Sequence, residues 1–194
     1  AFYLEKNESG KALEYTKSAL KINNQIDDWF GVSHNLNTIG MIYRRFGDLD
    51  KAIISLSESI KIKEGYKYKS GLKYSFINMG HIHYEIGSYN EALKYYNNSL
   101  KIFKNIGDRE EGLICIYNCI ASIYFIKSQY LKAEKNIEKS ISIQKQKGLK
   151  ELELSNKVLL YLIYNKLNKS FDINTIYGVI KERREYDIDE ELKK

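Results

Sequence analysis

The stretch that decides the fold is Asn37-Thr-Ile-Gly-Met-Ile-Tyr43, which continues after a short turn as Gly47-Asp-Leu-Asp-Lys-Ala52. A similar stretch runs from Asn78 to Ala92. Several sets of positions recur along the chain at steps of 40 or 41 residues. They are Ala12, Ala52, Ala92 and Ala133; Gly40, Gly80 and Ala121; Gly47, Gly87 and Ser128. One period shared by independent sets of positions indicates a repeat array.

Each period contains two segments with helical spacing of apolar residues. Leu36, Ile39 and Tyr43 follow one such ladder, and Ala52 and Leu56 begin the second. Each repeat is therefore predicted to be a helical hairpin, in which a glycine ends the first helix and Asp or Ser caps the second. The turns between repeats are predicted at Gly65, Gly107-Asp108 and Gly148. The predicted helices are 9–25 after a remnant at 2–6, 28–46 with 49–64, 68–86 with 89–105, 108–127 with 130–146, and 150–168 with 172–185.

Small residues recur where the two helices of a hairpin would cross. Gly40, Gly80 and Ala121 lie on the first helices, and Ala52 and Ala92 lie on the second. We expect these residues to let the helices approach closely, which is a structural role and not a catalytic one.

The two quoted stretches resemble the tetratricopeptide repeat, whose pattern runs aromatic or Leu, Gly, Tyr, Ala, aromatic, Ala. Here the period is about 40 instead of about 34, the chain has no proline, and His83 stands where Tyr is expected. The resemblance implies an all-α, right-handed superhelical solenoid of helical hairpins. About four and a half repeats would fill residues 1–185 as a piece of a longer protein, with 186–194 a polar tail or the start of a further element.

Composition excludes several broad classes of protein. The 194 residues are 43 % hydrophobic and 29 % charged, which is typical of a folded globular chain. No apolar run approaches the length of about 18 residues that a membrane-spanning helix needs. The net charge is +6, but lysines alternate with acidic residues along the chain, which favours solvated helix faces over nucleic-acid binding.

Catalytic and metal-binding motifs were sought, and none was found. The chain contains no Gly-rich phosphate loop, Gly-x-Ser-x-Gly elbow or His-Glu-x-x-His motif. Cys115 and Cys119 lie four residues apart, and His81 lies one repeat earlier, but a structural zinc site normally needs a fourth ligand. We expect no enzyme activity, no metal and no cofactor, and the two cysteines fit a reducing compartment such as the cytoplasm.

The resemblance implies that a protein or peptide partner lies in the concave groove lined by the first helix of each repeat. We expect an acidic end of the partner at the arginines, an apolar side chain at the aromatic residues, and bonds from asparagine amides to the partner's backbone. The expected peptide-binding residues are Asn37, Met41, Arg44, Arg45, Tyr74, Asn78, His81, Tyr84, Asn118, Ser122 and Phe125.

Two structural alternatives remain open for these residues. Tyr74, Tyr84 and Phe125 could instead be partly buried against a neighbouring repeat, and Arg44 and Arg45 could be a solvated pair beside Asp48 and Asp50.

A second function class also remains open. Long-repeat arrays of this kind are attached to bacterial sensor kinases, cyclases and transcription regulators, so the chain could be a ligand- or peptide-sensing regulatory segment. Its richness in Ile, Lys, Asn and Tyr suggests an AT-rich, bacterial genome.

The segment from Val158 to Tyr164 is apolar nearly all round, which a helix in water should not be. We expect the helix beginning at Asn174 to cover one side of it. A missing downstream segment or a second copy of the chain would cover the other side, and the second case would give a homodimer.

Overall fold

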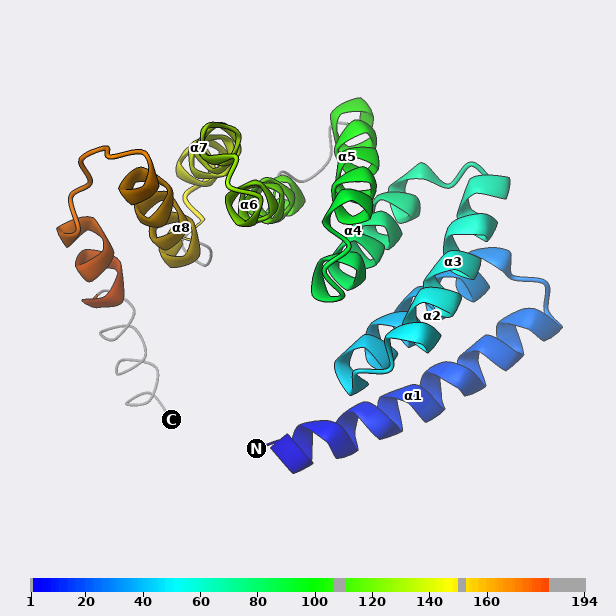
Figure 1. Cartoon of the computed structure of the whole chain (residues 1–194). Coiled ribbons are helices and arrows are strands. Elements are labelled where there is room, and N and C mark those ends of the chain that lie inside the picture. The colour runs from blue at the N-terminus through cyan, green and yellow to red at the C-terminus, as the bar shows by residue number, and fades with distance from the viewer. Residues whose placement is uncertain (1, 107–110, 150–152, 182–194) are drawn as a thin grey trace. The chain divides into compact units, whose positions relative to one another are not determined.

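The computed structural model describes residues 2–106, 111–149 and 153–181. The described segments are helices joined by short turns (Figure 1). The helices are α1 (Phe2–Gln25), α2 (Trp29–Phe46), α3 (Leu49–Gly65), α4 (Lys69–Glu85), α5 (Tyr89–Ile106), α6 (Glu111–Ile126), α7 (Tyr130–Lys147) and α8 (Glu153–Lys166). Residues 174–181 are also helical. Among the described helices, none has the length and apolar character needed to cross a membrane.

Most helix ends lie within a few residues of the predicted ones, with one correction at the start of the chain. The sequence predicted a remnant at 2–6 separate from a helix over 9–25, but α1 is continuous from Phe2 to Gln25. Gly10 lowers the helix propensity without stopping the helix, and no proline interrupts it. The predicted helix over 172–185 is helical at 174–181, and residues 182–194 lie outside the described part of the chain.

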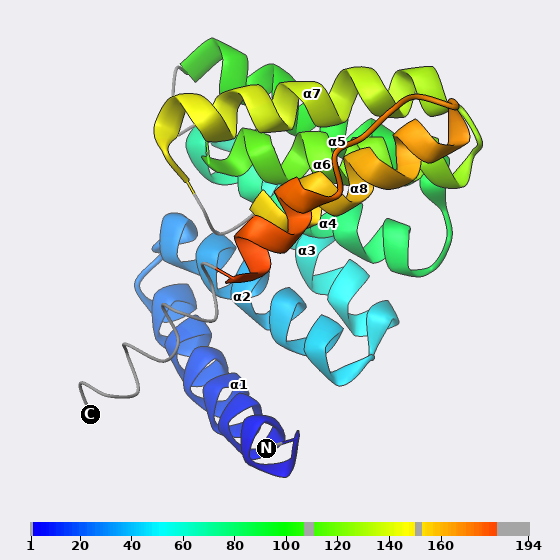
Figure 2. The same cartoon turned by 90° about the vertical axis from the view of Figure 1, so that its left-hand side faces the viewer.

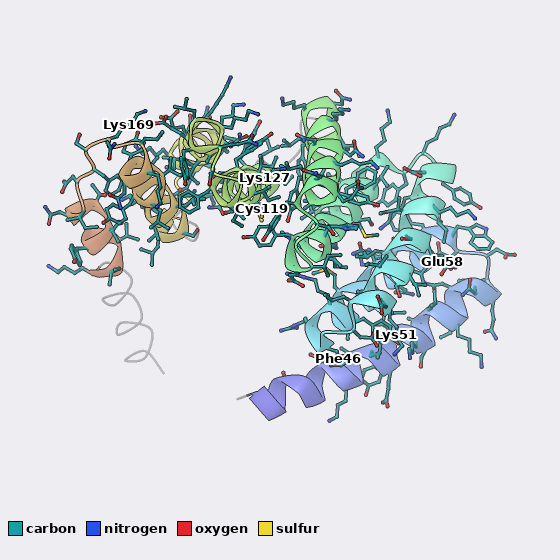
Figure 3. All side chains as sticks on the ribbon, viewed as in Figure 1. Phe46, Lys51, Glu58, Cys119, Lys127 and Lys169 are labelled. Atoms are coloured by element: carbon teal, nitrogen blue, oxygen red, sulfur yellow. The ribbon has the colours of Figure 1, made fainter. Side chains whose placement is uncertain are left out.

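The turn inside each hairpin uses a residue in the left-handed backbone conformation. Gly47 has φ 79° and ends α2, and Gly87 has φ 76° in the equivalent turn. The carboxylate of Asp48 then accepts a hydrogen bond from the Lys51 backbone N–H at 3.2 Å, which caps α3. Figure 3 labels Phe46 and Lys51 on either side of this turn. The predicted glycine end and Asp cap are confirmed at this hinge.

Two other turns differ from the expectation. Ser128 takes the left-handed conformation itself, with φ 56°, and Gln129 follows as an N-cap without a side-chain hydrogen bond. Between α3 and α4 the left-handed residue is Lys67, with φ 53°, whereas Gly65 was expected to form the turn and instead ends α3. The predicted turn at Gly107-Asp108 lies outside the described residues.

Close contact between paired helices depends on the small residues. A Cβ on Gly40 would lie 2.7 Å from Leu56 Cγ, and one on Gly80 would lie 2.6 Å from the Tyr96 ring, so neither site has room for a side chain. The alanines that recur on the second helices, namely Ala52, Ala92 and Ala133, are completely buried.

A serine also ties the second helix of each hairpin to the first. Ser59 Oγ donates to the Ser33 carbonyl at 2.6 Å. The equivalent bonds, from Ser99 to Lys73 and from Ser140 to Ile114, are both 2.9 Å. Because the same bond recurs at the repeat spacing, the hairpins share one internal geometry.

The chain divides into two compact units, residues 1–107 (unit 1) and 108–194 (unit 2). In unit 1, α2 pairs with α3 and α4 pairs with α5 (Figure 1). Its core includes Leu56, Met79 and Ile82. In unit 2, α7 lies along α6 and is followed by α8 (Figure 2), and the core includes Ile137 and Ile163.

Candidate partner-binding site

The first helices of the hairpins contact each other within each unit. In unit 1, α2 contacts α4, and in unit 2, α6 contacts α8. We call the surface along these first helices the inner face of each unit. It carries the residues that the sequence predicted to bind a partner, divided between the two units.

On the inner face of unit 1, Arg44 forms an ion pair with another residue of the same unit. Arg44 Nε on α2 donates to Glu85 Oε1 on α4 at 2.8 Å, and the Arg44 Nη2 atom bonds the same oxygen. Asp48, which was considered as a neighbour for Arg44, bonds Lys51 instead. Arg44 therefore links two repeats, whereas the Arg45 side chain is exposed.

A buried polar junction connects α2, α3 and α4. Asn37 Oδ1 accepts hydrogen bonds from Ser75 Oγ at 2.9 Å and from Asn78 Nδ2 at 3.2 Å. Lys63 Nζ donates to Ser75 Oγ at 2.8 Å. Lys63 is only 3 % exposed, and this burial lowers the pKa of its ammonium group to about 8. The amides of Asn37 and Asn78, expected to bond a partner's backbone, thus bond each other across repeats.

The aromatic residues of unit 1 differ in their accessibility. Tyr74 is 47 % exposed, and the edge of its ring meets Phe103 with centroids 6.2 Å apart. Tyr84 is half-buried and packs against Tyr89 at 5.7 Å. Tyr74 therefore remains accessible to a partner, whereas Tyr84 is partly covered by its own hairpin.

Two histidines on α4 pack against tyrosines of α5. His81 Nδ1 lies 2.8 Å from Tyr96 Oη, within hydrogen-bond distance. His83 stacks on Tyr95 with ring centroids 5.2 Å apart, which confirms that it packs where the repeat has Tyr. Burial lowers the pKa of His83, although Glu91 acts in the opposite direction.

The inner face of unit 2 has a similar junction made of amides. Asn118 Nδ2 donates to Asn156 Oδ1 at 2.7 Å, and Asn156 Nδ2 donates to Gln144 Oε1 at 2.8 Å. Ser122 Oγ donates to the Asn118 carbonyl at 3.0 Å. Phe125 packs against the core of unit 2 and against Tyr130, so its ring is partly buried, as the structural alternative allowed.

The two cysteines lie on α6 and are half-buried (Cys119 is labelled in Figure 3). Within the described ranges, no three His, Cys, Asp or Glu side chains lie close enough together to hold a metal ion.

A hollow of about 430 Å³ opens between α6 and α8. Its walls bring together Asn118 and Ser122, both predicted site residues, with apolar side chains of α8. The residues that line it are Asn118, Ser122, Leu154, Ser155, Val158, Leu159 and Leu162. Val158 is 38 % exposed and Leu162 is 39 % exposed. Sequence reasoning left these α8 residues out of the site, although it singled out α8 as a helix with too much apolar surface.

The described part of the chain also shows what covers the rest of α8. Ile163 is completely buried, and Ile176 and Val179 of the segment 174–181 are buried as well. Lys157 Nζ donates to the Thr175 carbonyl at 3.3 Å. The segment 174–181 therefore lies against α8, as predicted, and the apolar surface that remains exposed faces the hollow.

Comparison with known sequences places the chain in a family. Residues 33–66 and 73–146, together more than half of the chain, match profiles of the tetratricopeptide repeat. The chain belongs to the tetratricopeptide repeat family, whose repeats are generally protein–protein interaction modules.

Two curated relatives are similar over parts of their length. The TPR repeat-containing protein MJ1428 of Methanocaldococcus jannaschii is 27 % identical over 172 residues, which is 88 % of this chain. The transcriptional activator NprA of Geobacillus stearothermophilus is 28 % identical over 108 residues, or 56 % of this chain. The matched region is 26 % of each relative, so the chain spans about a quarter of their length.

Solved structures show the same fold at low sequence identity. BtubC (BKLC) from P. vanneervenii superposes with a TM-score of 0.78 at 16 % identity, covering 97 % of this chain and 76 % of that one. The TPR-like repeats of a Podosopora anserina protein described as a kinesin light chain give a TM-score of 0.68 at 14 % identity, covering 96 % and 90 %. The predicted all-helical solenoid of tetratricopeptide hairpins is confirmed.

Proposed function

We propose that this chain is a non-enzymatic interaction module that binds segments of another protein on the inner faces of its two units. The observation that carries the proposal is the hollow between α6 and α8, where two predicted site residues meet exposed apolar side chains. Exposed apolar surface in a concave site is typical of binding surfaces, since burying it is favourable.

Three kinds of inner-face residue would contribute to binding in different ways. Tyr74 and Leu162 present apolar area, whose burial gives affinity that depends little on salt. Arg45 presents an exposed charge, which mainly changes the association rate and its salt dependence. Asn37, Asn78 and Asn118 would act indirectly, because their side chains hold adjacent repeats together.

The proposal is tested by mapping a bound partner onto the helices. Once a partner is purified, hydrogen exchange of the full chain with and without it should show protection on α2, α4, α6 and α8. Tyr74→Ala should weaken binding roughly tenfold at any salt concentration, and Arg45→Glu should weaken it mainly at low ionic strength. Protection confined to α3, α5 and α7 would place the partner on the opposite face and contradict the proposal.

One observation favours the second candidate function, a regulatory segment of a larger signalling protein. The similarity to the transcriptional activator NprA covers only a quarter of that relative. Under this candidate, a peptide bound on the inner face would change the activity of an attached effector domain. Sequencing the complete gene tests it, because a gene that encodes only repeats would contradict the regulatory candidate and favour a scaffold.

A further inference from the structure

We infer that the hollow between α6 and α8 binds one face of an amphipathic helix from a partner protein, with an acidic residue of that helix beside Lys166. This inference deepens the proposed function, on which it rests. It names the chemical class of the partner segment and the residues that select it.

The walls of the hollow carry no charged side chain. From Gly112 to Ile126, α6 contains no charged residue, in a chain of which 29 % is charged. The side chains that α8 contributes to the hollow are also uncharged, namely those of Leu154, Ser155, Val158, Leu159 and Leu162. A charged group of the partner would lose its water in the hollow and would find no opposite charge there. The part of the partner that enters the hollow is therefore apolar.

The apolar side chains of α8 in the hollow have the spacing of one helix face. Leu154, Val158 and Leu162 are each four residues apart and form a ridge along one face of α8. Exposed Lys166 follows after one more step of four. Each step rises about 6 Å along the helix axis. Apolar side chains one turn apart on a partner helix have the same spacing, and an acidic side chain one turn beyond them meets Lys166.

The hydrogen bonding inside the hollow suits a helix better than an extended peptide. An extended segment brings backbone N–H and C=O groups that need hydrogen-bond partners when buried. Two donor groups of the hollow already make hydrogen bonds within unit 2, since Asn118 Nδ2 donates to Asn156 Oδ1 and Ser122 Oγ donates to the Asn118 carbonyl. A helix satisfies its own backbone, so it can enter this wall without losing hydrogen bonds.

The hollow in unit 2 lies where unit 1 has a larger side chain. Asn37 bonds Ser75, and Asn118 bonds Asn156 with the same sequence separation of 38 residues, so these junctions are equivalent. In this correspondence Ser122 stands where unit 1 has Met41. The short serine side chain leaves open space that a methionine side chain would occupy.

The experiment uses the full chain and two synthetic peptides of identical composition. Both are rich in Ala and Gln so that they form helices. One carries three leucines four residues apart on one face, with a Glu one turn beyond them at each end, and the other has the leucines scattered around the helix. Fluorescence anisotropy should show that the first peptide binds at least about tenfold more tightly than the second.

Variants locate the binding on this surface. Leu162→Asp places a charge in the hollow and should weaken binding about tenfold or more. Ser122→Met fills the hollow with the residue found in unit 1, and it should have the same effect while the fold is retained. Leu131→Asp, on α7 at a site 69 % exposed, is the matched control and should leave binding unchanged. Lys166→Glu should weaken binding at low salt and much less at high salt.

Several results would overturn the inference. Equal binding of the two peptides, or Ser122→Met binding like the parent, would show that the hollow does not select a helix. A dimer that becomes a monomer on Leu162→Asp would assign the surface to a second copy of the chain. If only proline-containing peptides, which cannot form helices, bind and protect the inner face, the inference fails and the proposed function stands. If no peptide of either kind binds, both fail.

Discussion

At the scale of single residues, Lys63 is a buried cation whose cost to stability depends on pH. Burial lowers its pKa from 10.5 to about 8, and its hydrogen bond goes to the Ser75 hydroxyl, not to a carboxylate. Between pH 8 and pH 10.5 the unfolded chain binds more protons than the folded chain, so the free energy of unfolding rises with pH. Below pH 8 both states are protonated, and the cost of burial is present in full.

Lys63→Met should therefore stabilise unit 1 near neutral pH by about 2 kcal/mol. The lowered pKa corresponds to about 3.4 kcal/mol at roughly 1.4 kcal/mol for each pKa unit, and the lost hydrogen bond to Ser75 offsets about 1.5 kcal/mol of it. The substitution should also remove this rise in stability at alkaline pH. Urea unfolding at neutral and alkaline pH measures both effects, with Lys61→Met at a neighbouring exposed site as the control. A Lys63→Met variant with the same pH dependence as Lys61→Met would show that the ammonium is not desolvated.

Gly40 lies where α2 and α3 pack together, and this position has no room for a side chain. An added methyl group would lie 2.7 Å from Leu56 Cγ and 3.2 Å from the Ala52 carbonyl oxygen. Gly40→Ala should lower the free energy of unfolding by about 1–3 kcal/mol through overpacking. Gly10→Ala is the matched change, because nothing lies within 4 Å of its added Cβ. It should stabilise α1 by up to about 1 kcal/mol, and thermal melts that show the same sign for both would contradict this account.

At the scale of helices, the sequence predicted the hairpins well, because glycine and alanine recur where paired helices cross. It did not predict how adjacent repeats bond. Asn37 and Asn118 were expected to face a partner. Each instead bonds a residue 38 positions later in the chain, and the 3.6-residue period of a helix does not reveal contacts between residues so far apart. The sequence also did not predict the burial of Lys63, because the lysines of the chain were expected to lie on solvated helix faces.

Asn156 is the residue that holds α8 to the preceding hairpin. It is completely buried, and it bonds Asn118, Ser140 and Gln144. Asn156→Ala would remove the partner of Asn118 Nδ2 and of Gln144 Oε1, at a cost of about 2 kcal/mol or more. Hydrogen exchange in α8 should become faster as a result. Asn136→Ala removes one bond to the Lys132 carbonyl at an exposed position and should change little, so equal effects of the two variants would argue against this role for Asn156.

At the scale of the whole molecule, the predicted site residues are divided between two units with different inner faces. Unit 1 has the Arg44–Glu85 ion pair and exposed Arg45, whereas α6 of unit 2 is uncharged from Gly112 onward. The sequence already shows this difference, because the expected site residues on α2 include Arg44 and Arg45, whereas those on α6 are uncharged. It could not locate the hollow, because the hollow depends on the side-chain volume at Ser122 and on which face of α8 stays exposed.

Each unit has its own hydrophobic core and its own polar junction, so each should fold when it is expressed alone. Circular dichroism of fragments 1–107 and 108–194 should show helical spectra and cooperative melting. All residues that line the hollow belong to unit 2. Fragment 108–194 should therefore bind the helical leucine peptide within about threefold of the full chain's affinity, a difference under 1 kcal/mol. Fragment 1–107 should not bind it. A folded fragment 108–194 that has lost binding, or binding by fragment 1–107, would show that the hollow is not a sufficient site.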